Sequence, residues 1–522
     1  MIQGQKLVDW IAGRLERHWQ LVVAGVCVVY LAACWAVSAT KLLWFDELAT
    51  YYPAALPTIA DLIRFFFEGL DVHTPVSALV ERASLTLLGV NHLGMRAPYI
   101  LGYLLFCLCL FRFVALRTGP LWGMLAMSVP LVAPTIYYAT EMRPYPILMG
   151  LSALAAVCWQ EASEGRRRAV MIPLLWFTLT ASVSLHYYTV FVLVPFGVAE
   201  IVRWRSRGRP DWPMWLAIAS APAILLTFLP AIAKAKAAYA SGIWSRPSPG
   251  QIEETYRFLL ALAFPPAIIA LVVWMVLHLW VRNTSTPGRV PDPAVVPSPI
   301  PTAERVLIAF WALMPVYVVP ASYLAGGYVP RYALSCFAGV VLYLVMLIWR
   351  ASAGSRLPAM VGFLVLFGWF CLKSPGVVRK NLAGTGGYPF RTSQPFSTRS
   401  WMPLLDASPL PVVVSPAVFF LQFQHYAPES MRGRIRYLAS RKYAMELEGM
   451  DTGDTNLTMF ARMLPVPISS YDEFVRENKR FLLIAETTNP TWVIEKLKSD
   501  GATLILRNRQ DTFFLFEAVL PE

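Results

Sequence analysis

The chain alternates long apolar runs with short polar segments over its first 375 residues. About eleven runs have the length and apolarity of helices that cross the hydrocarbon core of a bilayer. They cover residues 20–40, 96–116, 119–138, 143–161, 169–186, 188–203, 212–232, 257–281, 305–325, 331–350 and 357–373. Residues 75–89 are also apolar, but they are too few to span comfortably and include Glu81 and Arg82. We therefore expect an amphipathic helix that lies in the membrane interface.

After residue 375 the pattern changes. A linker rich in Gly, Ser and Thr at 384–400 leads into alternating strand and helix signals. Strands are predicted at 411–415, 434–440, 481–486, 502–507 and 512–519, and helices at 416–426, 471–480 and 491–500. The sequence thus predicts an all-α polytopic membrane bundle over residues 1–375, with interfacial helices in the first outer loop. A small soluble α/β domain is predicted over residues 376–522.

Composition supports this division. Of the 522 residues, 57% are hydrophobic and 15% are charged, which excludes an ordinary soluble globular protein of this size. All seven cysteines lie within apolar runs, so they are predicted to be small buried hydrophobes rather than disulfide partners.

The chain has a net charge of +13, and the positions of its basic residues indicate how it crosses the membrane. If residues 75–89 do not cross the membrane, the positive-inside rule places the main basic clusters on the cytoplasmic side, with the N-terminus. These clusters are Arg112/Arg117, Arg166–Arg168, Arg203/Arg205/Arg207/Arg209, Arg282 and Arg350/Arg356. The outer face then receives residues 41–95, 139–143, 233–256 and 326–330, and the tail from about 376.

Unusual polar residues gather in these outer segments. Asp46 and Glu47 directly follow the first span, and further acids, histidines, arginines and tyrosines lie at 71–75, 96, 141–145, 186–187 and 331–332. Each has an ordinary explanation when taken alone: solvated loop acids, arginines that reach lipid headgroups, or an aromatic belt. Ionisable residues at the membrane edge are, however, functional candidates as a group.

The residue types in this group are chemically complementary. Arginines bind a phosphate or diphosphate through several hydrogen bonds. A carboxylate such as Asp46 can act as a general base that deprotonates an attacking hydroxyl. Together they suit the transfer of a group from a lipid-linked phosphate to an alcohol.

The chain resembles bacterial members of the C-type glycosyltransferase (GT-C) superfamily over roughly residues 20–350. Within it, the resemblance is to the branch of protein O-mannosyltransferases, the lipid A aminoarabinose transferase and the rhizobial lipopolysaccharide core transferases. Five motifs occur in the matching order: Phe45-Asp46-Glu47, Asp71-x-His73-x-Pro75, Arg96-x-Pro98, Glu141-x-Arg143-Pro144-Tyr145 and Arg331-Tyr332. The family usually has His-Pro-Pro where this chain has His73-Thr74-Pro75.

The resemblance implies a polyprenyl-phosphate-linked sugar as donor, an active site on the outer face, and inversion at the anomeric carbon. Asp46 would be the catalytic base, and Glu47 would raise its pKa or help to hold a divalent ion. Arg96, Arg143 and Arg331 would neutralise the leaving phosphate, with Lys234 and Lys236 of the loop 233–256 as further candidates. The expected substrate contacts are His73, Glu141, Tyr145, His186, Tyr187 and Tyr332.

No spacing of ligands resembles a dedicated metal site, so no obligatory cofactor is expected. A divalent cation held by Glu47 and His73 is the alternative. The expected partners are the lipid-linked donor, membrane lipids and a hydroxyl on a glycan, lipid or protein, but no nucleic acid. We expect a bacterial inner membrane location. A transporter of lipid-linked sugars remains the competing hypothesis, although the second half of the chain has no counterpart of the acidic pair.

Overall fold

The computed structural model describes residues 3–239, 245–284, 300–383, 401–486, 491–510 and 512–522. The predicted linker at 384–400 lies outside these residues. The chain divides into two compact units, and each unit combines separate stretches of sequence. The first unit contains Met1–Ser38, Arg96–Thr227 and Pro247–Gly376, and the second contains Ala39–Met95, Phe228–Arg246 and Val377–Glu522.

The described part of the chain contains seven helical segments that are long and apolar enough to cross a membrane. They are Trp19–Thr40, His92–Thr118, Arg168–Leu185, Tyr187–Arg207, Trp212–Ala238, Gly250–Arg282 and Arg356–Leu382. Thr302–Ala312 and Met314–Leu324 form an eighth if this pair, bent by 51°, is one span. The remaining three predicted spans are also helical, at Pro120–Val132, Tyr145–Ser163 and Cys336–Ala351. The chain is therefore a multi-pass membrane protein.

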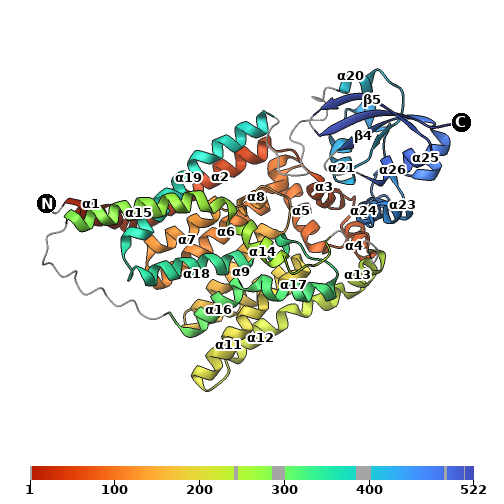
Figure 1. Ribbon diagram of the computed structural model, residues 1–522. Helices are drawn as coiled ribbons and strands as arrows, with labels where there is room; N and C mark the ends of the chain where they lie inside the picture. Colours follow the sequence, from red (N-terminus) through yellow and green to blue (C-terminus); the bar gives the residue numbers. More distant parts are fainter. Residues whose placement is uncertain (1–2, 240–244, 285–299, 384–400, 487–490, 511) are drawn as a thin grey trace. The chain divides into compact units, whose positions relative to one another are not determined.

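The helices of the membrane region pack as neighbours along much of their length (Figure 1). Their bounds are α1 (Gln3–Arg17), α2 (Trp19–Thr40), α6 (His92–Thr118), α7 (Pro120–Val132), α8 (Ile136–Ala139), α9 (Tyr145–Ser163), α10 (Arg168–Leu185), η1 (Tyr187–Val192), α11 (Leu193–Arg207), α12 (Trp212–Ser220), η2 (Ala221–Ile224), α13 (Leu225–Ala238), α14 (Gln251–Leu260), η3 (Ala261–Ala263), α15 (Phe264–Thr284), α16 (Thr302–Ala312), α17 (Met314–Ala325), η4 (Pro330–Ala333), α18 (Cys336–Ala351) and α19 (Arg356–Leu382). Helix α9 packs along α10, and α16 contacts both α11 and α18. Helices α6 and α9 approach closely at Gly102 and Gly150, where an added Cβ on Gly150 would collide with the Gly102 carbonyl.

Arginines that the sequence identified as basic clusters are paired with acids in the first unit. Arg117 at the end of α6 forms ion pairs with both Glu164 and Glu304. Glu304, on α16, is only 2% exposed. Asp211, before α12, accepts hydrogen bonds from Arg168 and Arg207 at 2.7 and 2.9 Å. These pairs connect the ends of helices that are distant in sequence, because a buried charge is tolerated only with a partner.

The second unit begins with the helices of the segment between α2 and α6. These are α3 (Phe45–Ala54), α4 (Ile59–Phe67) and α5 (Pro75–Leu88). Helix α5 covers the residues for which an interfacial helix was predicted, and Pro75 is its first residue. Its Arg82 donates hydrogen bonds to the carbonyls of Ala54 and Pro57 at 3.1 and 2.9 Å, which holds the turn between α3 and α4.

The C-terminal part of the second unit contains a six-stranded sheet, which appears in blue in Figure 1. The strands are β1 (Val412–Val414), β2 (Ile435–Ala439), β3 (Ile468–Ser470), β4 (Arg480–Glu486), β5 (Thr503–Gln510) and β6 (Phe513–Val519), in the order β3-β2-β1-β4-β6-β5. The first four pair in parallel, and β6 is antiparallel to both β4 and β5. The helices are α20 (Met402–Asp406), α21 (Ala417–Tyr426), α22 (Glu429–Arg432), α23 (Arg441–Glu448), α24 (Thr452–Phe460), α25 (Tyr471–Glu477) and α26 (Trp492–Ser499). The predicted α/β domain is therefore confirmed.

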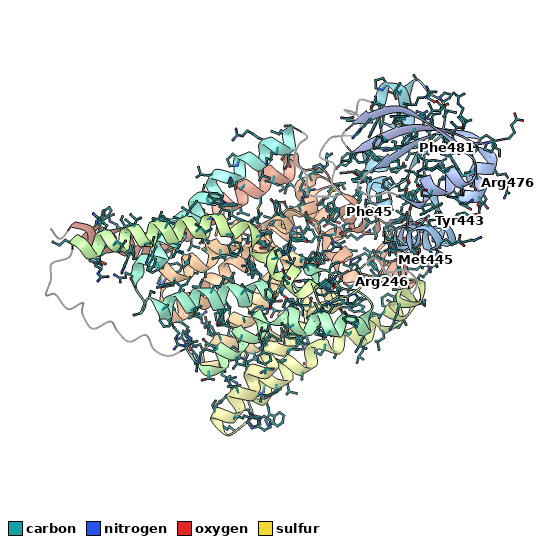
Figure 2. All side chains as sticks on the ribbon, viewed as in Figure 1. Phe45, Arg246, Tyr443, Met445, Arg476 and Phe481 are labelled. Atoms are coloured by element: carbon teal, nitrogen blue, oxygen red, sulfur yellow. The ribbon has the colours of Figure 1, made fainter. Side chains whose placement is uncertain are left out.

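One face of the sheet carries a buried core that includes Phe481, Leu483 and Trp492, and Phe481 is labelled in Figure 2. Two acids lie at its border. Glu448 accepts a hydrogen bond from the Trp492 backbone N–H, and Asp454 accepts from the Ser440 N–H at 2.9 Å and the Trp492 indole at 3.2 Å. Burial raises the pKa of Glu448 to about 7 and that of Asp454 to about 6.

Because both acids bind protons more tightly in the folded state, their ionisation as pH rises from about 4 to 7 lowers the stability of this domain. We expect Glu448→Gln to raise the unfolding temperature of the second unit by about 2–4 °C at pH 8, with no gain at pH 4. Hydrogen exchange of β4 during heating of the detergent-solubilised chain measures this. Glu446→Gln, at an exposed position of the same helix, is the matched control. A gain of equal size at both pH values would contradict the assignment.

Candidate functional site

The residues predicted to form the site divide between the two units. The first unit holds Arg96, Glu141, Arg143, Tyr145, His186, Tyr187, Arg331 and Tyr332. The second unit holds Asp46, Glu47, His73, Lys234 and Lys236.

In the first unit, five aromatic side chains from four elements form one cluster, which we call the Tyr332 cluster. Its members are Tyr138, Tyr145, His186, Tyr188 and Tyr332. The ring of His186 lies 5.1 Å from that of Tyr332 and 5.7 Å from that of Tyr145, measured between centroids. Tyr188 lies 4.9 Å from Tyr332. Three of the predicted residues, Tyr145, His186 and Tyr332, are thus brought together.

A tight turn after α8 delivers Arg143 to this cluster. The Arg143 N–H donates to the Glu141 carbonyl at 2.8 Å, and the Glu141 N–H donates to the Tyr138 carbonyl at 3.0 Å. Pro144 then allows α9 to begin at Tyr145, because a proline needs no N–H partner at a helix start. Glu141 and Arg143 are consequently buried at the helix terminus.

Two arginines make the Tyr332 cluster electropositive. The Arg143 guanidinium carbon lies 5.8 Å from the centroid of the Tyr145 ring, a cation–π distance. Arg331 directly precedes Tyr332 in η4. The Tyr145 hydroxyl is buried and has no hydrogen-bond partner among the described residues. Two guanidinium groups and a phenol donor beside an aromatic cluster can bind a phosphate oxygen.

Arg96 has a different environment. It is fully buried and donates a hydrogen bond to the Ser38 carbonyl at 2.9 Å. This contact ties α6 to the end of α2, where the last carbonyls of a helix lack intrahelical donors. Tyr187 is half-buried at the start of η1. Its neighbour Tyr188 makes the ring contacts of the Tyr332 cluster and donates a hydrogen bond to the Gly327 carbonyl.

In the second unit, Asp46 and Glu47 occupy the first turn of α3, next to the buried Phe45 that is labelled in Figure 2. Asp46 is half-buried, whereas Glu47 is fully buried. The Glu47 carboxylate accepts a hydrogen bond from the Trp44 N–H at 3.3 Å. Glu47 therefore closes the start of its own helix, a contact that the resemblance did not suggest. A helix N-terminus also favours negative charge at both positions.

His73 is held by Asp71, a residue of the same motif to which the sequence analysis gave no role. Its Nδ1 lies 2.6 Å from Asp71 Oδ1, and its backbone N–H donates to the same oxygen at 2.9 Å. Asp71 is 8% exposed. A carboxylate at Nδ1 fixes the orientation of the imidazole ring. The spacing Asp-x-His was the available signal, since an aspartate bonds readily to the backbone two residues later.

Lys234 and Lys236 lie exposed toward the C-terminal end of α13, within the second unit, and Lys236 is in its last turn. The backbone of Gly69 packs directly against Lys234, and its φ of +74° favours glycine. Tyr239 donates a hydrogen bond to the Leu70 carbonyl at 3.1 Å. The end of α13 is therefore fixed to the segment between α4 and α5. Residues 240–244 of the predicted loop 233–256 lie outside the described residues.

Within the described ranges, no group of three or more His, Cys, Asp or Glu residues is arranged to hold a metal ion. The contacts of the alternative ligands Glu47 and His73 include the backbone and Asp71 contacts given above.

Comparison with known proteins identifies the fold. No family model and no curated protein matches the sequence. Among solved structures, ArnT from Cupriavidus metallidurans in the apo state matches with a TM-score of 0.52 and 12% identity, over 96% of this chain and 97% of that chain. The same protein bound to undecaprenyl phosphate gives a TM-score of 0.49 and 12% identity, over 96% and 98%. The arabinosyltransferase EmbB from Mycobacterium smegmatis gives 0.32 and 14%, over 71% and 42%.

The likeness to apo ArnT extends over nearly the whole length of both chains. The GT-C fold expected from the ordered motifs is therefore confirmed at the level of the fold.

The contact of Glu47 yields a prediction about local stability. Glu47→Ala removes the acceptor for the Trp44 N–H, so we expect amide exchange in residues 44–50 to accelerate by about fivefold, as for a lost helix cap. Glu47→Gln keeps a carbonyl oxygen at the same place and should exchange more slowly than the alanine variant. Hydrogen exchange with mass spectrometry measures both. Equal exchange in Glu47→Ala and the unmodified chain would remove this role.

Proposed function

We propose that this protein is a membrane glycosyltransferase that transfers a sugar from a polyprenyl-phosphate-linked donor to a hydroxyl of a glycan, lipid or protein. The observation that carries the proposal is the Tyr332 cluster with Arg143 and Arg331, in a chain with the fold of apo ArnT. ArnT itself has been solved with undecaprenyl phosphate bound. The donor and its phosphate are therefore the chemistry that we assign to the first unit.

The donor phosphate is assigned to Arg143 and Arg331, with the Tyr145 hydroxyl as a further donor. A phosphate that leaves the sugar gains negative charge on its oxygens as the bond breaks. Guanidinium groups held in a low-dielectric aromatic setting stabilise that charge more strongly than they would in water. Tyr332, Glu141, His186 and Tyr187 are proposed to contact the sugar. Arg96 contributes by supporting its helix, given its bond to Ser38.

The proton of the acceptor hydroxyl is assigned to Asp46. The hydroxyl oxygen attacks the anomeric carbon, the bond from that carbon to the phosphate oxygen breaks, and the polyprenyl phosphate leaves with the electron pair. Asp46 takes the hydroxyl proton, and a single displacement inverts the anomeric carbon. His73, held by Asp71 through Nδ1, is proposed to contact the sugar or the acceptor. Lys234 and Lys236 are proposed as exposed cationic contacts for the donor headgroup.

We further propose that transfer takes place on the outer, periplasmic face of a bacterial inner membrane and needs no obligatory metal. The topology that places the basic clusters inside supports the first point. The second follows from the first-unit arginines, which supply the positive charge that a divalent ion would otherwise provide.

Asp46→Asn is expected to abolish transfer, because the amide cannot accept the hydroxyl proton, and a loss of at least a hundredfold in kcat is the scale for a general base. The assay mixes detergent-solubilised protein, a polyprenyl-phosphate sugar, candidate acceptors and EDTA. It measures glycosylated product and released carrier phosphate. Asp9→Asn, on the N-terminal helix α1, is the matched control and should retain activity.

Release of the carrier and formation of product without any membrane compartment would exclude the transporter. Wild-type protein that moves the donor across a vesicle membrane but never releases the carrier would contradict the enzyme. Wild-type turnover in Asp46→Asn would remove Asp46 as the base.

Arg143→Ala and Arg331→Ala are expected chiefly to weaken donor binding, by about tenfold to a hundredfold each, as for loss of a hydrogen bond to a charged group. Binding of a fluorescent polyprenyl phosphate to each purified variant measures the effect. Arg257→Ala removes an exposed arginine of α14 that pairs with Glu253, and should leave the affinity unchanged. Unchanged affinity in both cluster variants would exclude them from the phosphate site.

A further inference from the structure

Both backbone groups of Leu43, three residues before Asp46, are bonded by side chains of α21. The Leu43 N–H donates to the Tyr426 hydroxyl at 2.8 Å, and the Leu43 carbonyl accepts from Gln422 Nε2 at 2.7 Å. The Leu43 side chain is fully buried, and Gln422 is 3% exposed. Residues 41–44 lie between helices α2 and α3, where no helix ladder satisfies these groups. Side chains of helix α21 thus make the hydrogen bonds to Leu43 that a helix or strand would otherwise provide.

Further contacts within the second unit hold the same region. The Tyr52 hydroxyl, on α3, lies 3.4 Å from His425 Nδ1 on α21, and the His425 ring packs edge-on against Tyr51. Burial, together with the charge of Arg432, lowers the pKa of His425 to about 4, so at neutral pH its Nδ1 can accept from Tyr52. Helix α21 therefore contacts α3 itself as well as the segment before it.

A residue near the end of α19 makes a further contact with the end of α2. Asn381, at the end of α19, donates a hydrogen bond to the Thr40 hydroxyl at 3.3 Å. The Tyr426 hydroxyl also lies 3.3 Å from His92 Nε2, near the other end of the first outer loop. The segment just before α3 is therefore hydrogen-bonded by residues that lie more than 300 positions later in the chain.

We propose that α21 of the C-terminal domain positions the catalytic loop, with Gln422 and Tyr426 as positioning residues that fix residues 43–46. This inference rests on the proposed function, in which Asp46 is the base. The connection is short: α21 holds Leu43, the next residue Trp44 donates to Glu47, and Asp46 lies between these two fixed points. Neither Gln422 nor Tyr426 is assigned a contact with substrate.

Such positioning affects the chemical step more than donor binding. A base that is displaced by about 1 Å loses much of its effect, on the order of a hundredfold in rate. The donor phosphate, by contrast, is assigned to arginines of the first unit. A change in α21 should therefore lower kcat while the donor KM stays constant.

The test compares Gln422→Met and Tyr426→Phe with the unmodified full-length chain. Each variant keeps the size of the side chain and removes one bond to Leu43. We expect kcat to fall about tenfold in each, with donor KM within about twofold, and the Leu43 amide to exchange about tenfold faster in both. Gln424→Met, on the same helix with a side-chain oxygen that has no partner among the described residues, is the first control. Tyr443→Phe, which removes a 2.9 Å bond to Asp472 elsewhere in the domain, is the second.

Slowed kcat at constant donor KM, faster exchange at residues 42–47, and unchanged controls would support the proposal. Wild-type kcat in both α21 variants, or an equal loss in the controls, would overturn it. Exchange reports on the contact without any turnover. If the unmodified chain proves inactive, the proposed function fails, and faster exchange confined to the two α21 variants still supports the contact.

Discussion

A charge that leaves water at the edge of a bilayer must find a partner, and this constraint shapes both units. In the first unit, Glu304 is buried with Arg117, and Arg96 is buried with a carbonyl at the end of α2. In the second, the buried Glu47 is bonded to a backbone N–H. Arg143 lies at a cation–π distance from the ring of Tyr145.

Much of the architecture could be predicted because it depends on local patterns. Apolar runs of sufficient length indicate spans wherever they occur, and Pro75 marks the start of α5 as a rigid first residue should. Five strands of the sheet were predicted from alternation, but β3 was not. Its sequence Ile-Ser-Ser contains a single apolar residue, whereas the equally short β1 is the apolar run Val-Val-Val. The short helices α20, α22, α23 and α24 were not predicted either.

The candidate site could be predicted less completely from the sequence than the fold. The order of the motifs identified the segments that carry the candidate site residues. It did not show that these residues divide between two units, because that division depends on tertiary packing. The cap at Glu47 was hidden because its partner position is Trp44, whereas the recognisable cap signals begin with Ser, Thr, Asp or Asn. Arg82 illustrates the same difficulty. It lies in an amphipathic helix and yet bonds to carbonyls more than 20 residues away. Hydrogen bonds between residues so far apart produce no periodic pattern in the sequence.

The bonds from Leu43 to Gln422 and Tyr426 span 379 and 383 residues of chain. At ribosomal speeds of 5–20 residues per second, about 20–80 s separate synthesis of the acidic pair from synthesis of the helix that holds it. During that interval the backbone of Leu43 has no α21 to bind. The segment before α3 can therefore reach its final form only when nearly the whole chain has been translated. The ordering of the acidic pair is in this way tied to the completion of the C-terminal domain.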